Sequence, residues 1–178
     1  MILTDREIHL SLQHGHIKID PPPGPEAFSS TSVDLTLAPK GSIWPTNLSV
    51  PVRPGSVGYS YKTFATQQLP VTFPDYALEP GSFCLAWTRE ILDLPISSRI
   101  AARVEGKSSL ARLGLAVHVT APTIHSGFKG QIQLEIANLG PLTIVLDPGM
   151  RICQLIFEQT IGTPEAAYRG AFHGQSGS

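Results

Sequence analysis

Cysteine is scarce in this chain of 178 residues. Its two copies, Cys84 and Cys153, lie far apart in apolar runs that read FCLAW and ICQLIF. This spacing fits neither a zinc knuckle nor a disulfide scaffold. Because free cysteine is among the most frequently buried residue types, we predict that both thiols lie in the core.

Long apolar runs and an excess of one charge are also missing. No stretch approaches the roughly 18 apolar residues of a membrane span, and the first residues lack the features of a signal peptide. We therefore expect a cytoplasmic protein with no membrane partner. Thirteen basic and 14 acidic residues give a formal charge of −1, which does not favour a nucleic-acid polymer as partner. A small charged ligand would need only a local pocket.

Short strand patterns dominate what is present, and the length suits one domain. A helix is expected at about residues 5–14, where Thr4 and Glu7 have the spacing of a capping box and Gly15 ends the pattern. The histidines at 9, 14 and 16 fit a solvated surface. Residues 41–80 have no helical period and predict loops and edge strands. Alternating apolar residues predict strands at 32–37, 115–120, 131–137 and 142–146, and further strands are expected at 82–88, which reads as buried, and at 151–157. We expect a mainly β fold, a distorted β-barrel or jelly roll with a short N-terminal helix and one short central helix.

The central stretch, residues 105–135, carries the main chemical signals. A turn of sequence Gly-Lys-Ser-Ser (106–109) opens a one-turn helical pattern from Ser109 to Leu113, which Gly114 ends. Unpaired backbone N–H groups, two hydroxyls and the Lys107 ammonium would bind an anion such as phosphate. The alternative, that Ser108 is only an N-cap, is equally consistent with the sequence.

Glu135 lies in the predicted strand at residues 131–137. The apolar residues of this strand share one face (Ile132, Leu134 and Ile136), so Glu135 shares the other face with two glutamines. Taken alone, this pattern favours a solvated carboxylate on an exposed sheet face.

The run GKSSLARLGLAVHVTAPTIHSGFKGQIQLEIAN resembles the central block of dCTP deaminases, a branch of the trimeric dUTPase-like superfamily. Five further segments resemble the family in the same order: MILTDREI, STSVDLTL, PGSFCLAWTREILDLP, PGMRICQLIFE and YRGAFHGQSG. The resemblance covers nearly the whole chain. It implies a dUTPase-like deaminase domain at residues 1–165, a flexible C-terminal lid of the same domain at 166–178, and a homotrimer with sites between subunits. Asp34 would support the fold and the trimer around the site.

The resemblance implies an enzyme that hydrolyses dCTP, or a close pyrimidine nucleotide, to dUTP and ammonia. The H-x-E…P-C-x-x-C pattern of zinc-dependent nucleobase deaminases is absent, so we expect no zinc and no protein-held metal. Glu135 would act as general base and acid, Arg112 would orient the carboxylate and the water, Ser108 would assist, and the Ala121 carbonyl would hold the water or amine.

The same resemblance implies the nucleotide-binding residues. Lys107, Ser108, Ser109 and Gln154 would bind phosphates, with Mg²⁺ bridging the phosphate oxygens. Phe128 would be a platform for the deoxyribose. The remaining expected contacts are Thr120, Ile124 and His125, with Tyr168 and Gln175 from the lid.

Two positions depart from the family pattern. His125 replaces an aspartate that contacts the deoxyribose 3'-hydroxyl and, in dUTPases, positions the water that attacks the α-phosphate. Ala171 replaces a lysine of the lid, for which Arg169 could substitute. These departures leave two alternatives beside the deaminase: a dUTP/dCTP diphosphohydrolase, alone or bifunctional with deamination, and a non-catalytic nucleotide-binding regulatory trimer.

Overall fold

A computed structural model describes residues 1–48, 51–166 and 174–177. Twelve strands occur in this part of the chain, and every pairing between them is antiparallel. Their bounds are β1 (Lys18–Asp20), β2 (Phe28–Ser29), β3 (Ser32–Ile43), β4 (Leu69–Thr72), β5 (Ala77–Leu78), β6 (Phe83–Asp93), β7 (Ile100–Gly106), β8 (Leu115–Ala116), β9 (Thr123–Ile124), β10 (Lys129–Asn138), β11 (Ile144–Val145) and β12 (Arg151–Gln159). The mainly β fold that the sequence predicted is confirmed.

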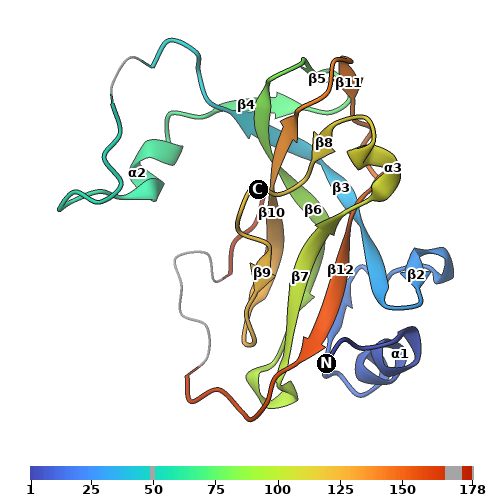
Figure 1. Ribbon diagram of the computed structural model, residues 1–178. Helices are drawn as coiled ribbons and strands as arrows, with labels where there is room; N and C mark the ends of the chain where they lie inside the picture. The colour runs from blue at the N-terminus through green and yellow to red at the C-terminus, as the bar shows by residue number, and fades with distance from the viewer. Residues whose placement is uncertain (49–50, 167–173, 178) are drawn as a thin grey trace.

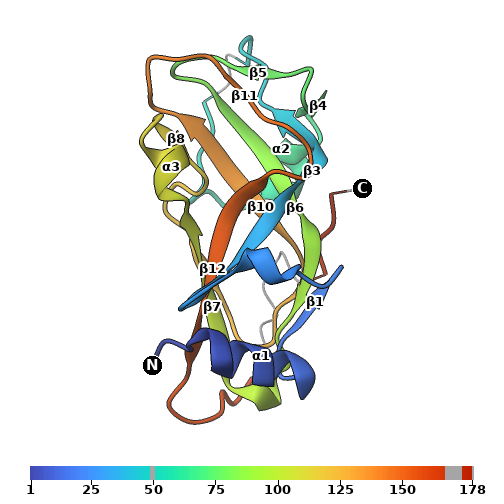
Figure 2. The same ribbon diagram turned by 90° about the vertical axis from the view of Figure 1, so that its right-hand side faces the viewer.

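One curled sheet forms the body of the molecule (Figures 1 and 2). Its main path runs β8-β10-β6-β3-β12-β7-β9, while β1, β2 and β4 pair with strands along this path. A separate ribbon joins β11 to β5. Strands distant in sequence therefore lie side by side, and the apolar residues on the inner face of the curl form a single core cluster.

Three α-helices and two 3-10 turns accompany the sheet in the described residues. They are α1 (Asp5–Gln13), α2 (Tyr61–Ala65), α3 (Ser108–Ala111), η1 (Pro25–Ala27) and η2 (Ile96–Ser98). Helix α1 lies across one end of the sheet, at the bottom of both ribbon views. It begins as predicted, but the Thr4 hydroxyl donates to the Glu7 carboxylate and makes no side-chain bond to a helical N–H. The three histidines near α1 are exposed, as predicted.

Helix α2 was not predicted. It belongs to a lobe between β3 and β4 that extends from the sheet at the upper left of Figure 1, and none of its residues is buried. Because such a helix does not bury an apolar stripe in the core, the 3.6-residue period that reveals most helices is missing from its sequence. None of the described helices is both long and apolar enough to cross a membrane.

The strand predicted at residues 115–120 is wrong beyond Ala116. Only Leu115–Ala116 pairs with β10, opposite Ala137 and Asn138. The chain then bends, although the Val117 carbonyl still accepts a hydrogen bond from the Glu135 N–H at 3.2 Å. The alternation of apolar residues gave no sign of this bend.

Candidate active site

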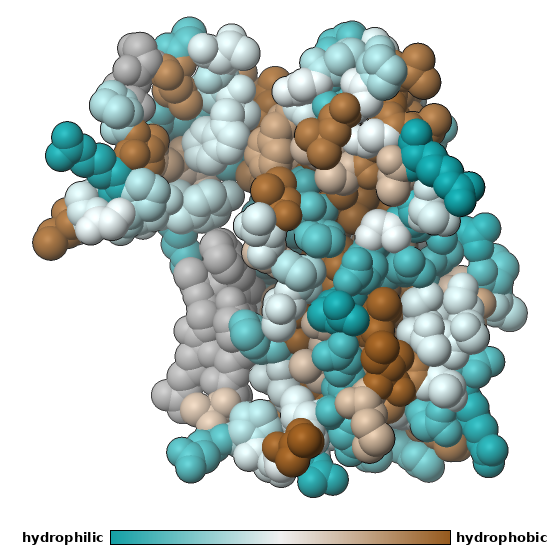
Figure 3. Space-filling model, in the orientation of Figure 1, coloured by the Kyte–Doolittle hydropathy of each residue, from teal (hydrophilic) through white to brown (hydrophobic). Residues whose placement is uncertain are grey.

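A cavity of about 750 Å³ opens where the loop between β8 and β9 faces β10. Strand β6 contributes Phe83 and Leu85 to its wall, and the lobe between β3 and β4 contributes Trp44 and Tyr61. The lobe that carries α2 projects at the upper left of the molecule (Figure 3). The volume of the cavity lies within the usual range for small-molecule sites.

Glu135 lies in the wall of this cavity. Its strand, β10, buries the alternate residues Ile132, Leu134 and Ile136, so the carboxylate points to the other face, as the period of two predicted. One carboxylate oxygen, Oε2, accepts a hydrogen bond from the Val119 N–H at 3.0 Å. This bond, together with the Glu135 N–H to Val117 carbonyl bond, fixes the acidic group against the β8–β9 loop.

Seven of the predicted site residues come together at this cavity. Four lie on or next to the β8–β9 loop and β9, and the others come from the turn before β10, from β10 itself and from the C-terminal segment. They are Thr120, Ala121, Ile124, His125, Phe128, Glu135 and Gln175. Ile124 and Phe128 are buried, whereas Thr120, Ala121 and His125 are exposed.

The cavity also has walls that the sequence prediction missed. Gln133 shares its strand face with Glu135, and the strand period was a signal that could have identified it. Trp44 and Tyr61 come from the region in which no pattern was found. Nothing in the order of residues indicates that this lobe borders the cavity.

A second group of predicted residues lies elsewhere on the chain. Ser108, Ser109 and Arg112 are exposed on and after α3, and neither they nor Lys107 and Gln154 are among the described residues that line the cavity. Within one chain the structure therefore does not bring the Lys-Ser-Ser turn to Glu135.

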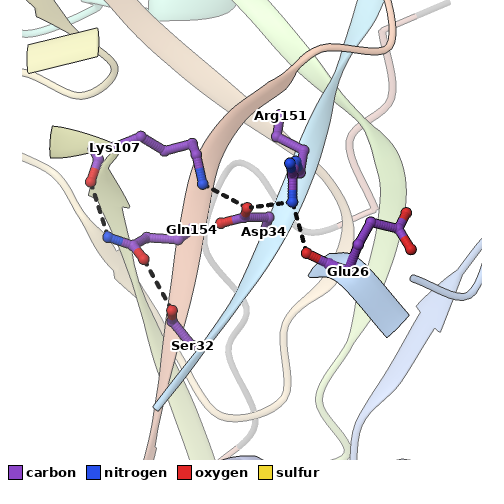
Figure 4. A network of polar contacts seen from close by, with 7 residues as sticks. Glu26, Ser32, Asp34, Lys107, Arg151 and Gln154 are labelled. Carbon is purple, nitrogen blue, oxygen red and sulfur yellow. Dashed lines mark hydrogen bonds and ion pairs between the residues drawn. The ribbon is translucent and has the colours of Figure 1, made fainter. Parts of the chain in front are cut away.

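Lys107 and Gln154 belong to a polar network across β3, β7 and β12 (Figure 4). The Lys107 ammonium lies 2.5 Å from Oδ2 of buried Asp34, and the Arg151 guanidinium lies 3.6 Å from the same oxygen. The Gln154 amide donates to the Gly106 carbonyl at 3.0 Å and accepts from the Ser32 hydroxyl at 2.9 Å. Asp34 thus ties the Lys-Ser-Ser turn to the central strand β3.

Three positions of the expected lid, Tyr168, Arg169 and Ala171, lie outside the described residues, and so does most of the lid at 166–178. Within the described ranges, no group of three or more His, Cys, Asp or Glu side chains is arranged to hold a metal ion.

Comparisons with known proteins agree on one family. A family model described as dCTP deaminase-like matches residues 2–160. A dCTP deaminase of Thermomicrobium roseum is 37% identical over 176 residues, covering 95% of this chain and 85% of that protein. A protein of Methanosphaera stadtmanae named dCTP deaminase, dUMP-forming, is 36% identical over 170 residues, covering 94% of this chain and 83% of that protein.

Two solved structures resemble this chain in fold, and one of them is a dCTP deaminase. The crystal structure of 2'-deoxycytidine 5'-triphosphate deaminase from Agrobacterium tumefaciens matches with a TM-score of 0.66 and 25% identity. The match covers 88% of this chain, which spans 47% of the length of that one. A dUTPase from phage phi11 of S. aureus shares the fold, with a TM-score of 0.52 and 12% identity over 85% of this chain and 95% of the other.

Proposed function

The chain belongs to the dCTP deaminase-like family of enzymes, and from that premise we propose that it removes the amino group of dCTP by hydrolysis. The observation that carries the proposal is the position of Glu135, a carboxylate anchored by a backbone N–H in the wall of a cavity of nucleotide size. The two relatives named above act on dCTP, as their names state.

In the proposed reaction a water oxygen bonds to C4 of cytosine. Glu135 takes a proton from the water and passes it to N3, so that C4 becomes tetrahedral without a build-up of charge. Glu135 then takes the proton of the new C4 hydroxyl group and delivers it to N4. The C4=O double bond forms as the C4–N4 bond breaks, and the amine leaves as ammonia. Ala121, which lines the cavity, would hold the water or the departing amine through its carbonyl.

The phosphates would bind the Lys-Ser-Ser turn of a neighbouring subunit. In a homotrimer with shared sites, α3 of one protomer would face the cavity of the next, bringing Ser108, Ser109 and Arg112 to the nucleotide. Asp34 would hold Lys107 in place beside the phosphates through their ion pair. Mg²⁺ would enter with the nucleotide, since this ion commonly binds through substrate phosphates and its own waters.

A second candidate function adds release of pyrophosphate, which would give dUMP. The relative from Methanosphaera stadtmanae is named as dUMP-forming, whereas that from Thermomicrobium roseum is not. His125 lies at the cavity in the place of the family's aspartate. A neutral histidine is a weaker acceptor than a carboxylate, which disfavours this second step.

The assay that separates the two candidates follows ammonia and pyrophosphate independently. The protein is incubated with dCTP, CTP, dCMP, 5-methyl-dCTP or dUTP in the presence of Mg²⁺. Ammonia without pyrophosphate supports simple deamination to dUTP, and both products from dCTP support the dUMP-forming reaction. Absence of ammonia from every cytosine nucleotide refutes the proposed deaminase.

The substitution Glu135→Gln should abolish ammonia release, because an amide cannot take the proton from water. Nucleotide affinity, measured by calorimetry, should stay within about tenfold of the parent. Glu158→Gln is a matched control: this carboxylate also lies on a strand and is ion-paired with Arg103 at 2.9 Å, but it does not line the cavity. Turnover retained by Glu135→Gln, or lost equally in the control, would remove the role assigned to Glu135.

A further inference from the structure

The C-terminal segment, residues 174–177, lies along the first residues of β10 beside the cavity. The Gly174 N–H donates to the Lys129 carbonyl at 2.8 Å, and the Gln131 N–H donates to the Gln175 carbonyl at 3.0 Å. The Gln175 side-chain amide donates to the Gln131 carbonyl at 3.0 Å. Finally, the Gly177 N–H donates to Oε1 of Gln131 at 2.7 Å. Gln131 takes part in three of these four bonds.

This end of β10 is a sheet edge. Strand β8 pairs with β10 only at Ala137 and Asn138, so the backbone groups of Gln131 that point away from β6 face the C-terminal segment. Such unpaired edge groups are a template for an added strand. The segment therefore occupies this edge through two backbone hydrogen bonds, although residues 174–177 form no strand.

An irregularity in the sheet fixes the Gln131 side chain. The register between β10 and β6 shifts after Gln131, leaving residues 88–90 of β6 opposite Ile132. At this bulge the hydroxyl of buried Thr88 accepts from the Ile132 N–H at 3.0 Å, and the Thr88 carbonyl accepts from the Gln131 amide at 2.8 Å. The side chain of Gln131 thus links β6 to Gly177. Bulges often occur next to active sites, where they redirect side chains.

Glycines permit the close approach on both sides. Gly130 has φ +147°, and a Cβ there would lie 2.8 Å from the Gln175 carbonyl oxygen. A Cβ at Gly177 would lie 2.4 Å from the Trp87 ring. Larger residues at either position would push the segment away from β10.

We propose that Gln131, together with Gly130 and the Trp87 ring, anchors the C-terminal segment of the same subunit and so makes Gln175 a wall of the reaction cavity. Gln131 is a positioning residue that acts on the nucleotide through Gln175. The inference rests on the proposed function in one respect, namely that this cavity is where dCTP reacts. The anchor itself does not depend on the reaction.

Docking of the C-terminal segment can be measured by tryptophan fluorescence, without an assay of enzyme activity. The chain has two tryptophans, so Trp44→Phe leaves Trp87 as the only one. In this background, deletion of residues 174–178 should shift the Trp87 emission to longer wavelength and increase its quenching by acrylamide, and Gly130→Ala should do the same. Gly81→Ala is the matched control, since Gly81 has φ +77° with open space around it. Unchanged Trp87 emission after the deletion overturns the anchor.

The effect on the reaction is tested by a double-mutant cycle in the protein with both tryptophans. Gln131→Ala and the deletion should each raise KM for dCTP about tenfold or more, while Gln131→Ala should add less than about twofold in the shortened chain. If Gln131→Ala raises KM by the same factor in the full and the shortened chain, Gln131 does not act through the segment. If no variant or parent releases ammonia, the proposed function fails, and the emission shift alone decides whether the anchor exists.

Discussion

Burial determines the chemistry of the two cysteine side chains. Cys84 lies on β6 and Cys153 on β12, and both are fully buried in the sheet. Burial raises the pKa of Cys84 to about 12 and raises the pKa of Cys153 further above its ordinary value. Since the thiolate is the reactive form, both groups should be inert in the folded protein.

We predict that unfolding becomes easier in alkali because of these thiols. Their folded pKa values exceed the unfolded value near 9.0, so their contribution is complete below that pH and is lost as pH rises towards about 12. Between about pH 9 and pH 10, the loss should be roughly 1 kcal/mol for each thiol. Urea unfolding across this range, compared with a Cys84→Ala/Cys153→Ala variant, measures it. An equally steep decline in the variant would contradict the assignment.

At the level of single residues, strand periodicity identified the face on which Glu135 lies but not its partner. The partner, the Val119 N–H, becomes available only because the chain leaves the strand geometry after Ala116. That bend depends on contacts between segments far apart in sequence. For the same reason the wall residues Trp44 and Tyr61 could not be predicted, whereas the core positions of both cysteines could.

Among the elements, α3 is held at its end by two glycines. Gly114 has φ +92°, and a Cβ there would lie 2.2 Å from the Gly140 nitrogen. A Cβ at Gly140 would lie 2.0 Å from the Leu113 carbonyl oxygen. The Leu139 N–H also donates to the Gly114 carbonyl at 2.8 Å. The loop after β10 is thereby locked to the residues that follow α3.

Gly114→Ala should therefore destabilise the protein by more than backbone strain alone, which costs about 1–2 kcal/mol. Gly149→Ala gives the comparison, because Gly149 has φ +81° but open space around it. Both free energies of unfolding are measured by urea titration. If the two substitutions cost the same, the contact between Gly114 and Gly140 contributes nothing. The sequence indicated the left-handed residue at 114 through its place after a helical pattern, but it gave no indication of Gly140.

At the scale of the whole molecule, the proposed site residues divide into two groups on one chain. One group surrounds Glu135 at the cavity, and the other lies on and around α3. Both groups were expected from the family resemblance, whereas the mainly β class followed from the strand patterns of the sequence. The sequence could not predict their separation within a chain, since the relative placement of motifs depends on the sheet topology.

A mixing experiment tests whether subunits share the site. Glu135→Gln and Arg112→Ala should each be inactive alone. Co-expressed in equal amounts, they should recover about a quarter of the parent activity, because in a cyclic trimer a quarter of the sites combine an intact Glu135 with an intact Arg112. Separate expression followed by brief mixing of assembled protein is the control. No recovery from co-expressed chains would place both residues in a single subunit's site.

The lobe between β3 and β4 borders the cavity through Trp44 and Tyr61, yet its helix buries no side chain. Substitutions in the lobe should therefore change the free energy of unfolding little while they alter the shape of the cavity. Glu135 and its neighbours lack this freedom because they lie on β10, whose alternate residues are buried in the core. Under the proposed function, such a division would let substrate preference change during evolution while deamination is retained, and it marks residues 44–68 as the region to randomise in a directed-evolution library.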